Sequence, residues 1–595
     1  MIDKKWGALL IVLNLIIING VILAVFNLSY PFLGHDYIYG ITSMLDSALH
    51  FRLNGLTIQW FTPSFGGGIP AYPNPNNGQF SLLALLTVFL PPWQAVMLTV
   101  VIYTSTGFIA CEYFLRHSLG LHSTASILGA VLFSANGFMI ERVAVGHLGY
   151  ITFPLFPLFL ILLVDRSLPV GYASAILGIV TASLIHFAGY FILIIFGLSI
   201  LTTLPLLSIH SPVLLNWKKL LATLAIGGIL ALVISASKLA AVYSFMRFFP
   251  RTITDEYNTP VLLSLVGIVL QLMGTMNLVP LFLIAGLRPD MIPAYLRSVT
   301  DANLGYWEVD MSLSPVVFLI LLVGIINIFH SRRKSLTTLF NGKRKIAWIC
   351  LFLALWLNIE FILAKGWIYP QLRRLPILSS LHINVRFAAA LIFPLVLSAV
   401  LLYNKWIKDQ LLSKSWVTFY TANILAIVFF GTYFLFKEDY VYRFYDITDG
   451  QKTYQQMQAG KSFEVTEIGK TRGNSNALLD RVSNLNLYEP AFGYKLEDFH
   501  PQVEAGPIWK ITNGYFNMTD PTGYVYPELN NNKPFDRFRV EDEEPLKLFV
   551  KHLQPDWKIP TYQRVLNWIS GMTFLTTLIY VITQSALNNR NKTSQ

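Results

Sequence analysis

Apolar segments of about 17 to 25 residues recur along most of this 595-residue chain, and a segment of that length crosses a lipid bilayer as a helix. Only 13% of the residues are charged and 54% are hydrophobic, whereas soluble domains carry about 25% charged residues. The sequence therefore predicts an all-α polytopic membrane protein and excludes a soluble enzyme or a nucleic-acid-binding protein. We place about twelve transmembrane helices at residues 7–27, 93–115, 122–140, 150–165, 169–187, 188–208, 220–241, 313–331, 346–364, 384–403, 417–437 and 564–584.

Lysine and arginine residues indicate the orientation of these helices, because short cytoplasmic loops of membrane proteins are enriched in them. Lys4 and Lys5 precede the first helix, and basic residues recur in every second connection, most densely at 332–345. We therefore predict that both termini are cytoplasmic. Residues 261–288 are also apolar, but the helices around them end and begin outside. This stretch is expected to lie at the outer interface or to dip into it.

Two long regions are then expected outside the membrane. One is the first outer loop, residues 28–92, within a transmembrane domain that spans 1–437. The other, residues 438–562, is polar and long enough to form a small extracytoplasmic domain. Alternating residues such as those of 462–468 favour an α/β or mostly β fold for it. Residues 563–595 are the last transmembrane helix and a cytoplasmic tail.

The first outer loop holds the first candidate site. His35 and Asp36 follow the first helix closely, in a loop whose many glycine and proline residues indicate specific turns. A carboxylate beside an imidazole at a helix mouth can act as a general base or bind a cation. The alternative is an aspartate in a solvated loop.

Further candidates are acids and a histidine near outer helix ends. His147 follows Glu141 and Arg142, a pair that can equally be a helix-capping ion pair. Glu308 and Asp310 lie two residues apart, directly after Trp307. The two acids can hold a sugar against the indole of Trp307, or they can be helix N-terminal acids.

A basic group on the outer side runs against the cytoplasmic bias of lysine and arginine. It consists of Arg373, Arg374, His382 and Arg386. Arginine pairs well with phosphate, so a phosphate-bearing ligand and lipid headgroups are both plausible partners. The chain has no Walker A loop, dinucleotide fingerprint or HExxH motif, which removes support for ATP-driven transport and zinc proteolysis.

The first outer loop contains a series of motifs: Asp36, Leu53-Asn54-Gly55, Trp60, Gly66-Gly67-Gly68-Ile69-Pro70, Gly78-Gln79-Phe80 and Leu90-Pro91-Pro92. Later in the chain come Pro154, Pro157, Trp307-Glu308 and the segment from Pro376 to Arg386-Phe387. Together these motifs resemble those of YfhO-type bacterial membrane proteins, a family similar to the GT-C glycosyltransferases.

The resemblance implies an inverting transfer of sugar from a polyprenyl-phosphate donor to an extracytoplasmic lipid, glycan or cell-envelope polymer, in a bacterial cytoplasmic membrane. Asp36 would be the general base, and Arg386 with Arg373 or Arg374 would hold the donor phosphate. Many family members have two adjacent acids, whereas the neighbour here is His35. The resemblance therefore leaves dependence on a divalent cation open.

Two other functions fit the same helices. One is a lipid or polysaccharide transporter or flippase without chemistry, and the other is a non-catalytic envelope assembly protein. A transporter would be expected to carry charged residues in the middle of its helices, and few are present. Lys238 and Glu360 lie near outer helix ends, and Glu112 lies near an inner one.

Overall fold

The computed structural model describes residues 4–25, 36–211, 215–248, 261–292, 294, 305–330, 343–375, 378–409, 415–436, 447–470, 477–485, 503–520, 522–533 and 536–593. His35 lies outside the described residues. Ten of the described helices are long and apolar enough to cross a membrane. The chain thus has the mostly helical architecture expected of a polytopic membrane protein.

Nine of the twelve expected segments overlap with long apolar helices, as far as the structure describes them. The other three, at 150–165, 169–187 and 313–331, coincide with apolar helices of 10–17 residues. The helices of the bundle are α1 (Lys4–Val25), α4 (Pro92–Tyr113), α5 (Ser123–Ser134), α6 (Gly137–Ala144), α7 (Phe156–Val164), α8 (Val170–His186), α9 (Tyr190–His210), α10 (Trp217–Ile234), α11 (Ala236–Met246), α12 (Val261–Ile284), α15 (Pro315–His330), α17 (Lys343–Leu363), α19 (Ile392–Lys408), α20 (Ser415–Phe430) and α27 (Thr561–Thr593).

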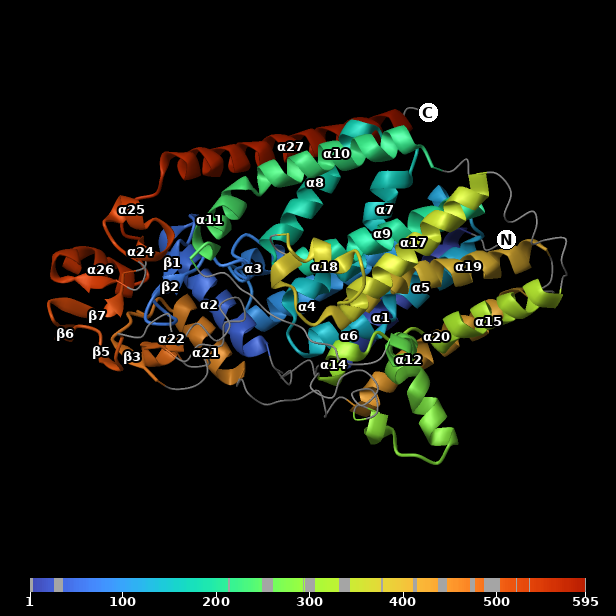
Figure 1. Ribbon diagram of the computed structural model, residues 1–595, viewed down its shortest axis with the longest axis horizontal. Helices are drawn as coiled ribbons and strands as arrows, with labels where there is room; N and C mark the ends of the chain where they lie inside the picture. The colour runs from blue at the N-terminus through green and yellow to red at the C-terminus, as the bar shows by residue number, and fades with distance from the viewer. Residues whose placement is uncertain are drawn as a thin grey trace.

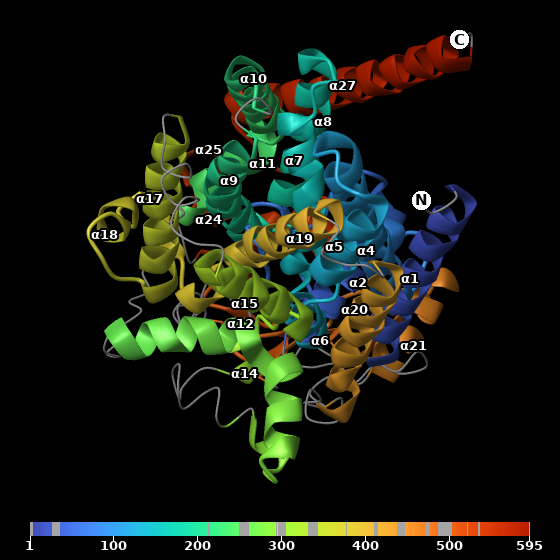
Figure 2. The same ribbon diagram turned by 90° about the vertical axis from the view of Figure 1, so that its right-hand side faces the viewer.

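Shorter elements connect or cap the bundle. They are the helices α2 (Tyr37–Asn54), α3 (Leu82–Leu86), α14 (Tyr306–Val309) and α18 (Tyr369–Leu372), a π-helical turn at Phe114–Ser118, and 3₁₀ segments that include η2 (Leu148–Leu155) and η5 (Asn384–Leu391). Both described ends of the chain lie at one end of the molecule, and the strands lie at the opposite end (Figure 1, Figure 2).

Helix α12 is broken in its middle. By its overall length and apolarity α12 is one of the ten helices that could cross a membrane, through Ser264–Ile284, a stretch that the sequence placed at the outer interface. Gly274 has a φ of 46° and a ψ of −158°, however, so the helix divides into two halves that are each shorter than a bilayer crossing. The two halves meet at an angle and run across the bundle rather than along it (Figure 2). A Cβ atom at Gly274 would lie 2.2 Å from oxygen atoms of Asp310 and Ser312, so the position excludes any side chain.

Most of the strands lie within residues 447–593. This part of the chain also contains helices α21 (Ile447–Gln458), α22 (Ala477–Asp480), α24 (Thr522–Val525), α25 (Pro527–Asn530) and α26 (Glu543–Val550). In the described residues its two sheets have the orders β4-β3-β5 and β6-β7-β8. These strands are β3 (Glu467–Gly469), β4 (Val482–Asn484), β5 (Gly506–Pro507), β6 (Ile511–Thr512), β7 (Tyr515–Thr519) and β8 (Arg537–Arg539).

In the described residues the buried cluster of this part includes side chains of the first outer loop, whereas the sequence predicted a separate domain at 438–562. Trp60 and Phe65 of the first outer loop are buried in one cluster with Phe516 and Phe549. The loop also forms the hairpin β1 (Phe61–Thr62) and β2 (Ile69–Pro70), and the backbone of its Gly66–Gly68 turn bonds to Asn484 and Thr519. The first outer loop and the later segment are therefore one folded unit, which we call the outer unit.

Candidate functional site

A cavity of about 260 Å³ lies where the helix bundle meets the first outer loop. Its walls come from segments far apart in the sequence: the first half of α2, residues 76–84, the turn 146–150, the α8–α9 turn at 187–191, Glu308 of α14, and residues 382–386. It contains Asp36, His147, Glu308, His382 and Arg386, which are five of the residues that the sequence singled out.

The turn before η2 brings His147 against the start of α2. Gly146 has a φ of 81°, and a Cβ atom there would lie 2.5 Å from the backbone nitrogen of Tyr37. The Asp36 amide donates to the Val145 carbonyl at 2.9 Å, and the buried Tyr37 hydroxyl donates to the Val143 carbonyl. These contacts fix Asp36 at the N-terminus of α2, where the helix dipole favours a negative charge.

A chain of hydrogen bonds runs from Arg142 through His147 to Asp36. Arg142 Nη1 lies 2.7 Å from His147 Nδ1, and His147 Nε2 lies 3.2 Å from Asp36 Oδ2. A guanidinium can only donate, so Nδ1 must accept and carry no proton. The proton of the neutral imidazole is therefore on Nε2, and it is donated to the carboxylate of Asp36. Burial lowers the pKa of His147, which favours this neutral form.

Glu308 is clamped by two buried arginines. Its Oε2 accepts from Arg142 Nη1 and from Arg386 Nε, both at 2.6 Å, and its Oε1 accepts from Arg386 Nη2. Burial alone would raise the pKa of Glu308, but the charges of Arg142 and Arg386 outweigh it and hold that pKa well below its usual range. Glu308 is thus a carboxylate whose oxygens are already paired, and its single negative charge is shared by two buried arginines, of which Arg386 lines the cavity.

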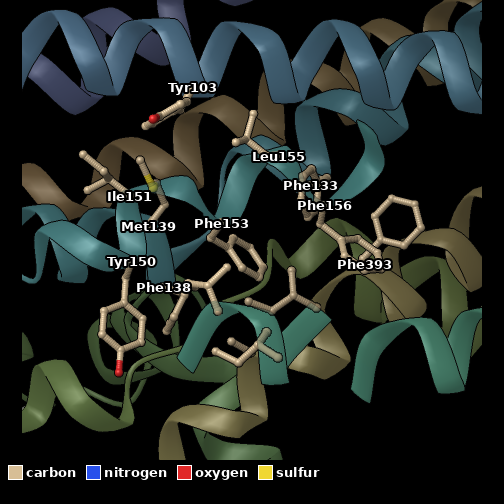
Figure 3. Packing of buried hydrophobic residues seen from close by; sticks show 14 of the residues in the cluster. Tyr103, Phe133, Phe138, Met139, Tyr150, Ile151, Phe153, Leu155, Phe156 and Phe393 are labelled. Carbon is tan, nitrogen blue, oxygen red and sulfur yellow. The ribbon is translucent and has the colours of Figure 1, made fainter. Parts of the chain in front are cut away.

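Tyr150 joins this ion cluster to the apolar core. Arg386 Nη1 donates to its hydroxyl at 2.9 Å, and both Arg386 and Arg142 lie over its ring. Figure 3 shows Tyr150 at the edge of an aromatic cluster beside Phe138, with its hydroxyl directed away from the cluster. These packed rings hold Tyr150, and with it one side of the ion cluster, in a fixed position.

Asp310 does not line the cavity. It is fully buried, and its carboxylate accepts from the Thr275 and Ser312 backbone amides and from both of their hydroxyls. These bonds hold the break of α12 next to Gly274. Asp310 therefore has a structural position in the fold. Its contacts match neither the helix N-terminal acid nor the sugar-binding acid that the sequence suggested.

Arg373 and Arg374 also lie away from the cavity, just after α18. Arg373 is half-buried and Arg374 is exposed. Of the expected basic group, only His382 and Arg386 contribute to the cavity wall. Glu308 and Tyr150 already bond to three N–H groups of Arg386, so two of its five donors remain for a ligand.

Sequence reasoning missed Arg142 as a member of the site. It is fully buried in α6. Its strongest signal in the sequence is that a charged residue lies within an apolar helical segment, where charged residues are rare. Reasoning also missed Ser43 and Ser47 of α2, which repeat at helical spacing after Asp36. That spacing was visible, but two serines in a helix carry little signal on their own.

The described residues contain no group of three or more histidine, cysteine, aspartate or glutamate side chains that could hold a metal ion. Asp36, His147 and Glu308 lie near one another, but both oxygens of Glu308 are bonded to arginine. Comparison with models of known protein families and with curated proteins finds no match for this chain.

Proposed function

We propose that this protein is a membrane-embedded glycosyltransferase of GT-C type that transfers a sugar, with inversion, from a polyprenyl-phosphate donor to an acceptor hydroxyl. The observation that carries the proposal is Asp36, a carboxylate oriented by a neutral histidine at the wall of a polar cavity beside a buried arginine pair. The motifs that resemble YfhO-type proteins are consistent with this and cover much of the helical part.

In the proposed step the acceptor oxygen attacks the anomeric carbon of the sugar. A new C–O bond forms there as the bond between that carbon and the phosphate oxygen breaks. Asp36 takes the proton of the acceptor hydroxyl, and polyprenyl phosphate leaves with the bonding electron pair. A general base of this kind contributes about 10²–10⁴-fold to the rate. No metal ion or other cofactor is needed to balance the step.

His147 supports Asp36 without touching substrate in this scheme. Its Nε2–H bond holds one carboxylate oxygen, so the carboxylate keeps a fixed orientation toward the cavity. Geometry matters here, because about an ångström of misplacement can cost roughly a hundredfold in rate.

The donor phosphate is assigned to Arg386 and His382, the cavity-lining members of the basic group. Glu308 neutralises much of the arginine charge, so phosphate binding relies on the two remaining N–H donors of Arg386. Arg373 and Arg374, just after α18, are assigned to lipid headgroups instead.

We further propose that the protein lies in a bacterial cytoplasmic membrane with both termini inside and the outer unit outside. The termini and the strands lie at opposite ends of the bundle, as this orientation requires (Figure 1). The outer unit is proposed to bind the acceptor, a lipid, glycan or envelope polymer, since it extends from the cavity wall.

The test uses the full chain in lipid nanodiscs with a synthetic polyprenyl-phosphate sugar. We expect release of polyprenyl phosphate that depends on an added acceptor and is abolished in Asp36→Asn. The exposed Arg374→Ala serves as a control that retains full turnover. Movement of the intact donor across a vesicle membrane, without cleavage of the sugar–phosphate bond, would contradict the proposal and favour a flippase.

A further inference from the structure

One face of α2 carries small polar residues into the cavity. Gly40, Ser43 and Ser47 follow Asp36 at steps of four, three and four residues, which places them on one side of the helix. All four line the cavity. The face therefore begins at the proposed base and continues along α2 toward the outer unit, as a row with two hydroxyl groups, those of Ser43 and Ser47.

The hydroxyls of this row are not used by the fold. The side chain of Ser47 is 3% exposed, yet neither its hydroxyl nor that of Ser43 bonds to any residue in the described part of the chain. Thr42 on the same helix differs, because its hydroxyl turns back to the Ile38 carbonyl at 2.7 Å. Because both serines line the cavity, a ligand there can bond to their hydroxyls without breaking a bond that the fold uses.

The opposite wall, residues 76–78, is held in place by a buried lysine. Lys238 Nζ donates to the carbonyls of Tyr72, Asn74 and Asn77 at 2.6–3.0 Å. The Asn76 amide oxygen accepts from the Tyr190 hydroxyl at 2.7 Å. The three carbonyls occupy the three N–H donors of Lys238, which does not line the cavity itself, so the wall presents uncharged amide and backbone groups that are held in place.

The charged residues of the cavity wall form one connected group, since Asp36 bonds to His147, and Glu308 pairs with His147 and Arg386. Ser43 and Ser47 lie about 10 and 16 Å further along α2 than Asp36, at about 1.5 Å per residue, and neither they nor residues 76–81 bring a charged side chain to the cavity. The part of the cavity beside the two serines is therefore its uncharged end. At about 260 Å³ the space is smaller than the roughly 300–1,000 Å³ typical of drug-sized ligands. A space of this size holds one sugar ring.

We infer that the uncharged end is the subsite for the transferred sugar and that this sugar is a single ring without charge. This rests on the proposed function. Ser43 and Ser47 would bond to ring hydroxyls, since a serine hydroxyl both donates and accepts. A carboxylate on the sugar would meet the Asp36 charge nearby and find no cation in the α2 row, so desolvation would oppose its binding.

The test measures both binding and transfer with two polyprenyl-phosphate donors, which carry glucose or glucuronic acid. We expect kcat/KM for the glucuronyl donor to be lower by about 100-fold or more, since a buried charge without a partner is disfavoured by that much. Equal kcat/KM for the glucosyl and glucuronyl donors would overturn the subsite while the transferase stands. A donor set in which nothing binds or transfers would overturn the transferase as well.

Variants of α2 locate the subsite. Ser47→Ala and Ser43→Ala should each weaken binding of the glucosyl donor by about 3- to 10-fold, the effect of one lost hydrogen bond. Thr42→Val is the matched control, because its hydroxyl bonds to the helix backbone, and its donor affinity should stay at the wild-type value. Ser47→Leu should fill the subsite and abolish donor binding with unchanged thermal unfolding. Equal affinity in all four variants would overturn the assignment.

Discussion

Arg142 donates a hydrogen bond from Nη1 to Nδ1 of His147 at 2.7 Å, and the same Nη1 also bonds to Glu308. The contact puts the imidazole proton on Nε2, which faces Asp36. The proposed base is therefore oriented by the same arginine that neutralises part of the buried ion cluster. Changes in that cluster should reach Asp36 through His147.

Replacing Asp36 by asparagine should lower the turnover of a defined polyprenyl-phosphate sugar by about 10²–10⁴-fold, because the side-chain volume stays and the base is lost. Donor affinity should remain within about twofold. Asp36→Glu should recover little, because it moves the carboxylate by about an ångström. Steady-state kinetics in nanodiscs measure both variants, and turnover of Asp36→Asn at the wild-type rate would rule out this base.

Acidification should destabilise the protein through His147. Its pKa in the folded protein is lowered by burial, so the unfolded chain takes up a proton there at a higher pH than the folded chain does. The stability it contributes is complete above the unfolded pKa of about 6.5 and is lost as pH falls toward the lower folded value. Thermal unfolding between pH 7.5 and 5.5 should show a larger decrease for wild type than for His147→Gln. Parallel curves for the two proteins would contradict this.

Glu308→Gln should destabilise the protein by about 3–5 kcal/mol, because it leaves the buried Arg142 and Arg386 without a counter-charge. Glu504→Gln is a matched control in an exposed ion pair with Lys510, where we expect a change of at most about 1 kcal/mol. Denaturation of the detergent-solubilised variants measures both. Similar stability losses in the two variants would show that Glu308 does not hold the cluster together.

Lys238→Met should raise KM for the donor by about tenfold, equivalent to about 1.4 kcal/mol of binding. The reason is that the cavity wall at 76–78 loses the lysine that holds its backbone carbonyls in place. Lys219, near the start of α10, likewise donates to two backbone carbonyls, those of Asp165 and Leu168, and it does not border the cavity wall at 76–78. Lys219→Met should therefore lower stability without changing KM. Michaelis–Menten kinetics separate the two, and an unchanged KM in Lys238→Met would disprove the bracing role.

Cysteine labelling should show opposite sides for the outer unit and the C-terminal helix. In a background with the exposed Cys350 replaced by serine, a cysteine at the exposed Glu544 should react with an impermeant maleimide in intact cells. A cysteine at the exposed Asn588 should react only after the cells are opened. The reverse pattern would invert the proposed orientation.

The broken helix α12 illustrates how far the sequence reaches. Apolar length made residues 261–288 resemble a crossing, and only the alternation of basic loops argued against it. The structure attributes the break to Gly274, whose backbone lies against Asp310 and Ser312. Nothing near Gly274 in the sequence signals this, because both partners come from a segment about 36 residues later.

Sequence alone determined the helices and drew attention to Asp36, because helix length and apolarity are local properties and each crossing helix must satisfy its own backbone hydrogen bonds. The tertiary structure alone decided the surroundings of Asp36. Glu308 pairs with Arg142 across 166 residues and with Arg386 across 78, and the first outer loop shares its core with residues 465–550. Such pairings depend on how distant segments pack, so no local pattern of hydropathy or charge encodes them.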